Sequence, residues 1–177
     1  MNQGCAVRLT ALVTILFWTL FCTGQDVHTS LVKDGVNVSI TANQPYQVMS
    51  GQGKRAVLSV ECSQKGSKAM HLVMFSAGES VAEDNAETRP KNGEITFTTE
   101  LKGSKERTNW IPYGDAITYA FYGKTEPERV KFLQLLLASP TFSVEFTPFL
   151  TGQALKSEFD VTKLRAEIIQ HPECVTK

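Results

Sequence analysis

The feature that most constrains the fold of this chain is a series of short segments in which apolar and polar residues alternate. Residues 141–147 are the clearest case, because Phe142, Val144 and Phe146 share one face. Strict alternation is typical of a β-strand with one buried face. The same pattern predicts further strands over 35–40, 55–62, 69–75, 94–101, 106–111, 116–122 and 153–159.

Two segments carry a helical pattern instead. Thr125 and Glu128 form a possible capping box before residues 126–138, and Asp160 is placed to cap a helix over 161–171. Strands follow strands through short turns, so antiparallel pairing is favoured over alternating strands and helices. The sequence therefore predicts a mainly β fold, all-β or α+β, arranged as an antiparallel β-sandwich with two short helices near the C-terminus.

The first 24 residues differ from the rest of the chain. Arg8 precedes an apolar run of about a dozen residues, and Cys22 and Gly24 put small residues at the −3 and −1 positions of a cut before Gln25. This pattern predicts a signal peptide over 1–24 and an exported protein, periplasmic or secreted, with no membrane span in its mature form. An uncleaved anchor and a lipid-modified Cys22 are the alternatives.

The remaining chain divides by composition. Residues 25–54 are expected to be an N-terminal strand and loop region, with 25–34 loose, and 55–177 the main β-rich domain. Removal of 1–24 takes away one base and no acid, which leaves 17 basic and 18 acidic side chains. This balance argues against a nucleic-acid partner, which selects a basic surface.

Two cysteines remain after such a cut, Cys62 and Cys174. An even pair in an exported chain predicts a disulfide. The closed loop of about 110 residues would contribute about 4–5 kcal/mol in the chain-entropy model. A metal pair formed by Cys174 with His171 is the alternative, although few other ligands exist to complete it.

No catalytic motif emerges. Gly53 and Lys54 lack the rest of a phosphate-binding loop, and no Gly-x-Ser-x-Gly elbow occurs. His71 lies among apolar neighbours on a predicted strand, which favours a packed histidine over a base. The expected protein is therefore not an enzyme and needs no cofactor or metal, while a hydrolase with an unrecognised carboxylate site stays open.

Two groups of residues are candidates for ligand binding. A repeated Lys-Gly-Ser-Lys turn puts cations at two hairpin tips, where they could attract an anionic surface or a glycan, or serve only as soluble turns. Trp110 and Tyr113 could stack on sugar rings, although core packing is the common role of such rings. The candidate lysines are Lys65, Lys68, Lys102 and Lys105.

From about residue 55 to 174, the order of elements resembles the TagO/VasI family, exported bacterial proteins encoded with type VI secretion systems. The similarity lies in a strand that ends in Cys62, a Trp110 followed by a small, acidic segment, and a leucine-rich helix. It continues with the strand 144–149 and a short helix before Cys174. The resemblance implies a β-rich domain with a Cys62–Cys174 bridge and no catalytic residues.

The leading hypothesis is a non-enzymatic exported domain that binds an envelope protein, in its sharper form a type VI secretion accessory protein. A glycan- or cell-wall-binding module that uses Trp110 and the lysine turns is the alternative, and the hydrolase comes third.

Overall fold

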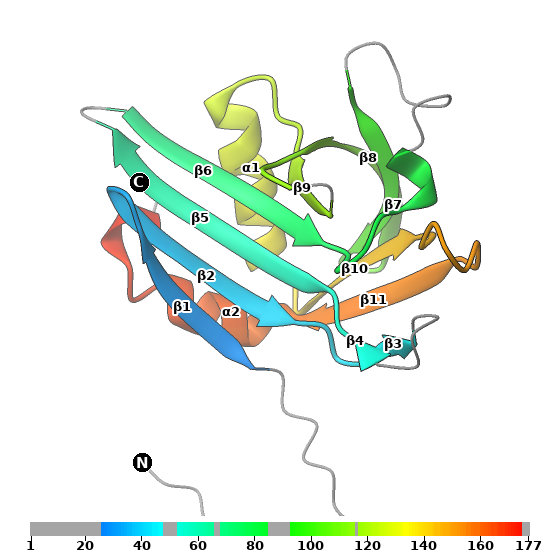
Figure 1. Ribbon diagram of the computed structural model, residues 1–177. Coiled ribbons are helices and arrows are strands. Elements are labelled where there is room, and N and C mark those ends of the chain that lie inside the picture. The colour runs from blue at the N-terminus through cyan, green and yellow to red at the C-terminus, as the bar shows by residue number, and fades with distance from the viewer. Residues whose placement is uncertain (1–25, 48–52, 66–67, 85–92, 116, 175–177) are drawn as a thin grey trace, which may run out of the picture.

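A computed structural model describes residues 26–47, 53–65, 68–84, 93–115 and 117–174. Nine of its strands form one antiparallel sheet in the order β1-β2-β5-β6-β9-β8-β7-β10-β11 (Figure 1). The strands are β1 Val27–Val32, β2 Gly35–Thr41, β5 Val57–Lys65, β6 Lys68–Ser76, β7 Ile95–Leu101, β8 Ser104–Pro112, β9 Thr118–Phe121, β10 Thr141–Phe146 and β11 Leu155–Asp160. A separate two-stranded sheet joins β3 Tyr46–Gln47 to β4 Gly53–Lys54.

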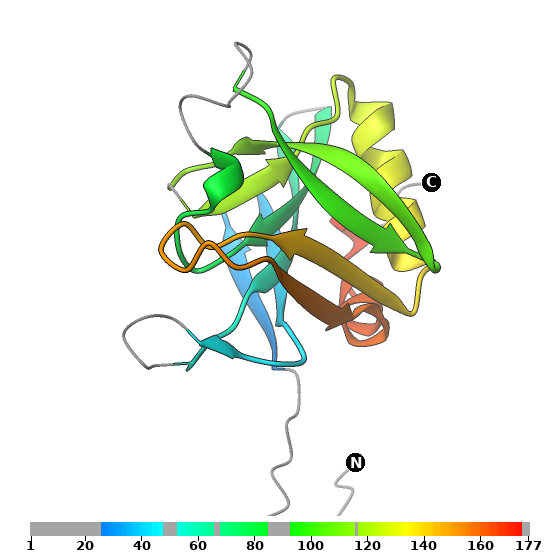
Figure 2. The same cartoon turned by 90° about the vertical axis from the view of Figure 1, so that its right-hand side faces the viewer.

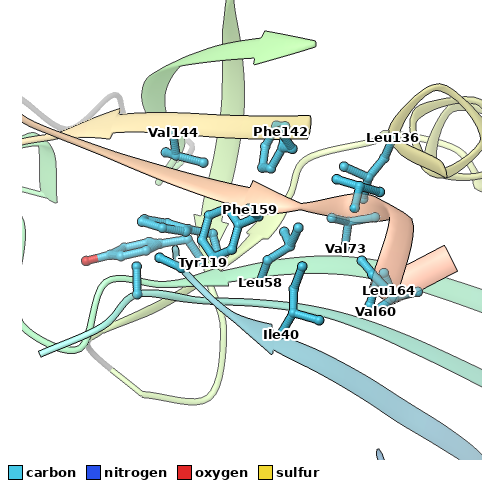
Figure 3. Close-up of a cluster of buried hydrophobic side chains, with 14 of the residues drawn as sticks. Ile40, Leu58, Val60, Val73, Tyr119, Leu136, Phe142, Val144, Phe159 and Leu164 are labelled. Carbon is cyan, nitrogen blue, oxygen red and sulfur yellow. The ribbon is translucent and has the colours of Figure 1, made fainter. Parts of the chain in front are cut away.

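The sheet curls so that its two ends face each other across the core. Figure 3 shows Phe142 and Phe159 of β10 and β11 pointing toward Ile40 and Leu58 of β2 and β5. The Asn43 N–H, just after β2, donates to the Glu158 carbonyl of β11 at 2.8 Å. No ladder between described residues joins the edge strands β1 and β11, so the sheet stays open.

The mainly β, antiparallel fold is thus confirmed, but the two-sheet sandwich is not shown. Continuous ladders run from β6 through β9 and β8 to β7 and make the two expected layers one sheet. Phe75 on β6 lies at its centre, in edge-to-face contact with Phe97, Trp110, Phe146 and Phe159. These rings come from four other strands, so one side chain links both ends of the curl.

Two helices cover the sheet. The mid-chain helix α1, Glu126–Leu137, packs against β6, and the C-terminal helix α2, Val161–Ile168, packs against β2. Asp160 caps α2 as expected, since its carboxylate accepts the Thr162 N–H at 3.0 Å. The capping box at Thr125 is wrong: its side chain makes no capping bond, and Glu128 accepts the Lys124 N–H instead, at 2.7 Å.

Two short 3-10 turns complete the fold, η1 Ala82–Asp84 and η2 Pro172–Cys174. The sequence predicts a mobile polar loop over 76–93. Most of the described residues in this loop are held by backbone hydrogen bonds instead. Val81 is buried and bridges to Pro148, and the Ala82 N–H donates to the Thr147 carbonyl at 2.7 Å. Residues 85–92 of that loop lie outside the described residues.

The expectation that residues 25–34 are loose is wrong for most of this segment. Val27–Val32 forms β1, paired along its whole length with β2. Most side chains of this strand are exposed, so the sequence carries no clear alternation, and the backbone ladder makes the strand. At its turn, Gly35 passes so close to the Cys62 carbonyl that a side chain there would collide with it.

Cys62 and Cys174 form the predicted disulfide, with Cα atoms 5.2 Å apart. It ties β5 to η2 across 112 residues of sequence. The metal pair with His171 is therefore wrong, since the Cys174 sulfur is used in the bridge. In the described part of the chain, no three His, Cys, Asp or Glu side chains gather as metal ligands. No helix among the described residues is long and apolar enough to cross a membrane.

Candidate functional site

A hollow of about 320 Å³ lies between the β7–β8 hairpin and α1. Figure 2 shows the hairpin reaching toward the C-terminal end of that helix. Most of its exposed lining is apolar. The lining residues are Thr99, Leu101, Lys102, Ser104, Glu106, Thr108, Phe121, Phe132, Leu135 and Ser139.

The hairpin is built by its turn. Leu101 pairs with Ser104 across a two-residue loop in which Lys102 has φ 52° and Gly103 φ 77°. Positive φ at both positions defines the type I′ turn, whose twist matches that of the flanking strands. Alternation then places Thr99 and Leu101 on the inner face with Ser104, Glu106 and Thr108, directed into the hollow.

Aromatic rings form the floor. Phe121 and Phe132 stack with centroids 3.8 Å apart and planes within 4°. Trp110 meets both rings edge-on, at 5.9 and 6.0 Å. Its indole N–H donates to the Thr108 hydroxyl at 2.8 Å, and that hydroxyl lies 3.1 Å from the Thr99 hydroxyl.

Trp110 is therefore a support for the hollow and is fully buried. This burial contradicts the expectation that Trp110 is an exposed ring that stacks on sugars. Tyr113 is 38% exposed and lies outside the hollow, beyond the end of β8. Burial first, and then the charge of Glu61, raises the pKa of Tyr113 above its usual value.

The backbone of β8 is open along this hollow. The Asn109 carbonyl accepts the Tyr122 N–H at 2.8 Å, and the Tyr113 N–H donates to the Thr118 carbonyl at 2.9 Å. Odd-numbered residues of β8 thus direct their backbone groups away from β7. For Lys105 and Arg107, β9 has already ended, and no backbone partner for them occurs among the described residues.

The β5–β6 and β7–β8 hairpins, which carry the two lysine turns, meet different ends of α1. Lys102 lines the hollow near Leu135 and Ser139 at the C-terminal end of α1, whereas His71, close after Lys68, contacts Glu126 at the other end. A 12-residue helix is about 18 Å long, which separates the two turns. The side chains of Lys65 and Lys68 lie outside the described residues.

Lys105 points to the outer face, where its ammonium donates to Glu145 at 2.6 Å. Beside it, Lys156 donates to Glu100 at 2.8 Å. That hydrogen bond lowers the pKa of Glu100 and raises the pKa of Lys156. These pairs set the charges of the two lysines against those of two glutamates on this part of the outer face.

The other end of α1 is fixed by a partly buried polar cluster. One Glu126 oxygen accepts the His71 backbone N–H at 3.0 Å and lies 2.6 Å from the His71 Nδ1. The other accepts both Arg129 Nε and Nη2, at 3.0 and 2.7 Å. His71 is only 3% exposed, as the sequence predicts for a packed histidine, so the cluster positions α1.

Sequence interpretation picked out Lys102 but missed the other residues that line the hollow. Phe132 and Leu133 are buried on α1, whereas Leu135 is 43% exposed. A leucine on the polar side of a helix was the one available signal. The break in pairing at Lys105 and Arg107 depends on where β9 ends, which no local pattern shows.

The chain matches no known family model, curated protein or solved structure.

Proposed function

We propose that this chain is a non-enzymatic exported domain that binds an extended segment of an envelope protein along the open edge of β8. The observation that supports this most is the free backbone of Lys105 and Arg107 beside an apolar hollow. An unpaired strand edge is a template for a further strand, and an adjacent pocket selects its side chains.

The binding mode follows from the alternation of β8. A segment laid beside β8 would hydrogen-bond to the backbone of Lys105 and Arg107. Alternate side chains of that segment would enter the hollow, where Leu101, Phe132 and Leu135 favour an aliphatic or aromatic residue. Lys102 and Glu106 at the hollow suit a polar residue next to that anchor.

Export is part of the proposal. A disulfide persists in oxidising compartments, and Cys62–Cys174 is consistent with such a place. The resemblance to TagO/VasI proteins supports the sharper form, an accessory protein of a type VI secretion system. Genes for such a system next to this gene would support that form, and their absence would count against it.

The binding mode is tested with end-blocked synthetic hexapeptides that alternate apolar and polar residues, titrated against the protein by fluorescence polarisation. We expect a subset with one large apolar residue to bind. Leu135→Asp should weaken binding at least tenfold because it puts a charge on the wall of the hollow. Leu150→Asp is the control, since Leu150 is 65% exposed and lies outside the hollow.

Backbone recognition is tested separately. Two versions of the bound peptide are compared, one N-methylated at its odd-numbered residues and one at its even-numbered residues. One version should lose binding and the other should keep it, because only alternate N–H groups face β8. Equal binding of the two versions, or equal loss with Leu135→Asp and Leu150→Asp, would contradict the proposal.

A further inference from the structure

The two edges of the sheet differ in protection. Strand β11 carries Lys156, Glu158 and Asp160, and the Asn43 N–H covers its Glu158 carbonyl. Strand β1, Val-His-Thr-Ser-Leu-Val, carries no lysine, arginine, acid or proline. Charges, prolines and covering loops are the usual means of keeping an edge from pairing, and β1 has none of these within its length.

The backbone of β1 is open at alternate residues. The Thr41 N–H donates to the Asp26 carbonyl at 3.4 Å, so even-numbered residues here face β2. Val27, Thr29 and Leu31 therefore direct their N–H and carbonyl groups outward. No backbone partner for these three occurs within the described ranges.

The side chains of the same three residues share one face. Thr29 donates its hydroxyl to Glu167 of α2 at 2.8 Å, which places this face on the helix side of the sheet. Val27 is 37% exposed and Leu31 is 89% exposed on either side of Thr29. Two apolar side chains thus stand at an open edge with nothing covering the larger one.

We infer that β1 is an interface between two copies of this chain, paired antiparallel about a two-fold axis through Thr29. Such an axis runs perpendicular to the sheet, so each face of one sheet continues as the same face of the other. Residues that lie opposite each other across the axis therefore belong to the same face. Val27 of each copy then lies opposite Leu31 of the other, and Thr29 lies opposite Thr29. All three outward-facing residues become hydrogen-bonded pairs in this register.

Charge favours this register over its neighbour. An axis through Ser30 would put Asp26 opposite Asp34 of the second copy and Val27 opposite Lys33. With the axis at Thr29, Asp26 lies opposite Val32 instead, so no like charges lie directly opposite each other. This register therefore pairs Val27 with Leu31 and avoids the contact between two acids.

The interface is small, because a pair of six-residue strands buries less than the roughly 1,200 Å² of a standard stable interface. The dimer is accordingly weak and depends on concentration. It joins two nine-stranded sheets into one and leaves the β8 edge of each copy free, so it is independent of the proposed function.

Sedimentation velocity over a dilution series tests the dimer. The wild-type chain should shift from monomer toward twice the mass as concentration rises. Leu31→Lys should abolish the shift, because it puts a lysine at the edge in place of the apolar contact with Val27. Leu150→Lys, an exposed leucine at a distant loop, should leave the shift unchanged.

Amide hydrogen exchange tests the register. On raising the concentration, the amides of Val27, Thr29 and Leu31 should become slower to exchange, while those of His28 and Ser30 stay equally slow at all concentrations. A monomer throughout, or a dimer that leaves the Thr29 amide unprotected, would overturn the inference.

Discussion

Glu126 is the residue on which the placement of α1 depends most. Its carboxylate accepts hydrogen bonds from His71 on β6 and from Arg129 one turn along the helix. The Arg129 Nη1 also donates to the Gly123 carbonyl at 2.7 Å, so the cluster fixes both the helix and the segment before it. The hollow lies near the other end of α1, and it depends on this cluster because the cluster sets the position of the whole helix.

Glu126→Ala should destabilise the fold by about 2–3 kcal/mol, because it leaves the His71 N–H and the Arg129 guanidinium without their acceptor. Urea unfolding measures this loss. Glu128→Ala is the matched control in the same helical turn. Its carboxylate is exposed and, among the described residues, accepts the Lys124 N–H alone, so the change should cost less than about 1 kcal/mol. Equal losses would show that the His71 cluster contributes nothing specific.

Glu100 gives the fold a dependence on acid. The bond from Lys156 lowers the pKa of Glu100 below the value of 4.5 for the unfolded chain, so its stabilisation is present above pH 4.5. It is lost as the pH falls through the lower, folded-state pKa. Glu100→Gln should therefore flatten the fall in urea midpoint below pH 4.5, by a small amount since the pair is exposed. Lys156→Gln should flatten that fall in the same way, because it removes the same hydrogen bond.

At the scale of elements, the turn of the β7–β8 hairpin is under local strain. Lys102 adopts φ 52°, a left-handed conformation that disfavours most side chains. Lys102→Asn should stabilise the fold by about 0.5–1 kcal/mol, because Asn-Gly suits a type I′ turn. Gly103→Val should destabilise it by about 1–2 kcal/mol, since Gly103 has φ 77°. Thermal unfolding of the two variants should move in opposite directions, and a shift in the same direction would contradict this account.

The sequence predicts elements well where burial sets the pattern. Phe142, Val144 and Phe146 alternate because one face of β10 is in the core, and β10 occupies Thr141–Phe146 as expected. The sequence does not predict strand β1, because most of its side chains are exposed. Its backbone ladder with β2 therefore requires no particular pattern of residue types. The Thr125 cap fails as well: its side chain makes no capping bond, and Glu128 accepts the Lys124 N–H in place of the N–H of Thr125.

At the scale of the whole molecule, the sequence identifies antiparallel strands but not how many sheets they form. Strand β9 is four residues long, and yet it pairs with both β6 and β8 and so joins the two halves. A sandwich and a curled sheet share the same alternation, because both have one buried face. The candidate lysines illustrate the same limit, since a repeated turn motif does not tell which end of α1 each turn reaches.

The Cys62–Cys174 bridge should contribute about 4–5 kcal/mol to the whole fold in the chain-entropy model. Replacing both cysteines with serine should lower the unfolding free energy by that order. Peptide mass spectrometry without reductant should find the linked pair in the purified protein. The same thermal midpoint with and without reductant, or two free thiols, would contradict this role.

The position of that bridge also has a consequence for the order of events during biogenesis. Its two sulfurs are separated by 112 residues, and β6 through α2 all lie between them. On the export proposed above, the chain emerges from its N-terminal side, so β1, β2 and β5 can pair before the second sulfur arrives. The disulfide would then form late, after these strands have paired, and a chain arrested before residue 174 would hold them without the bridge.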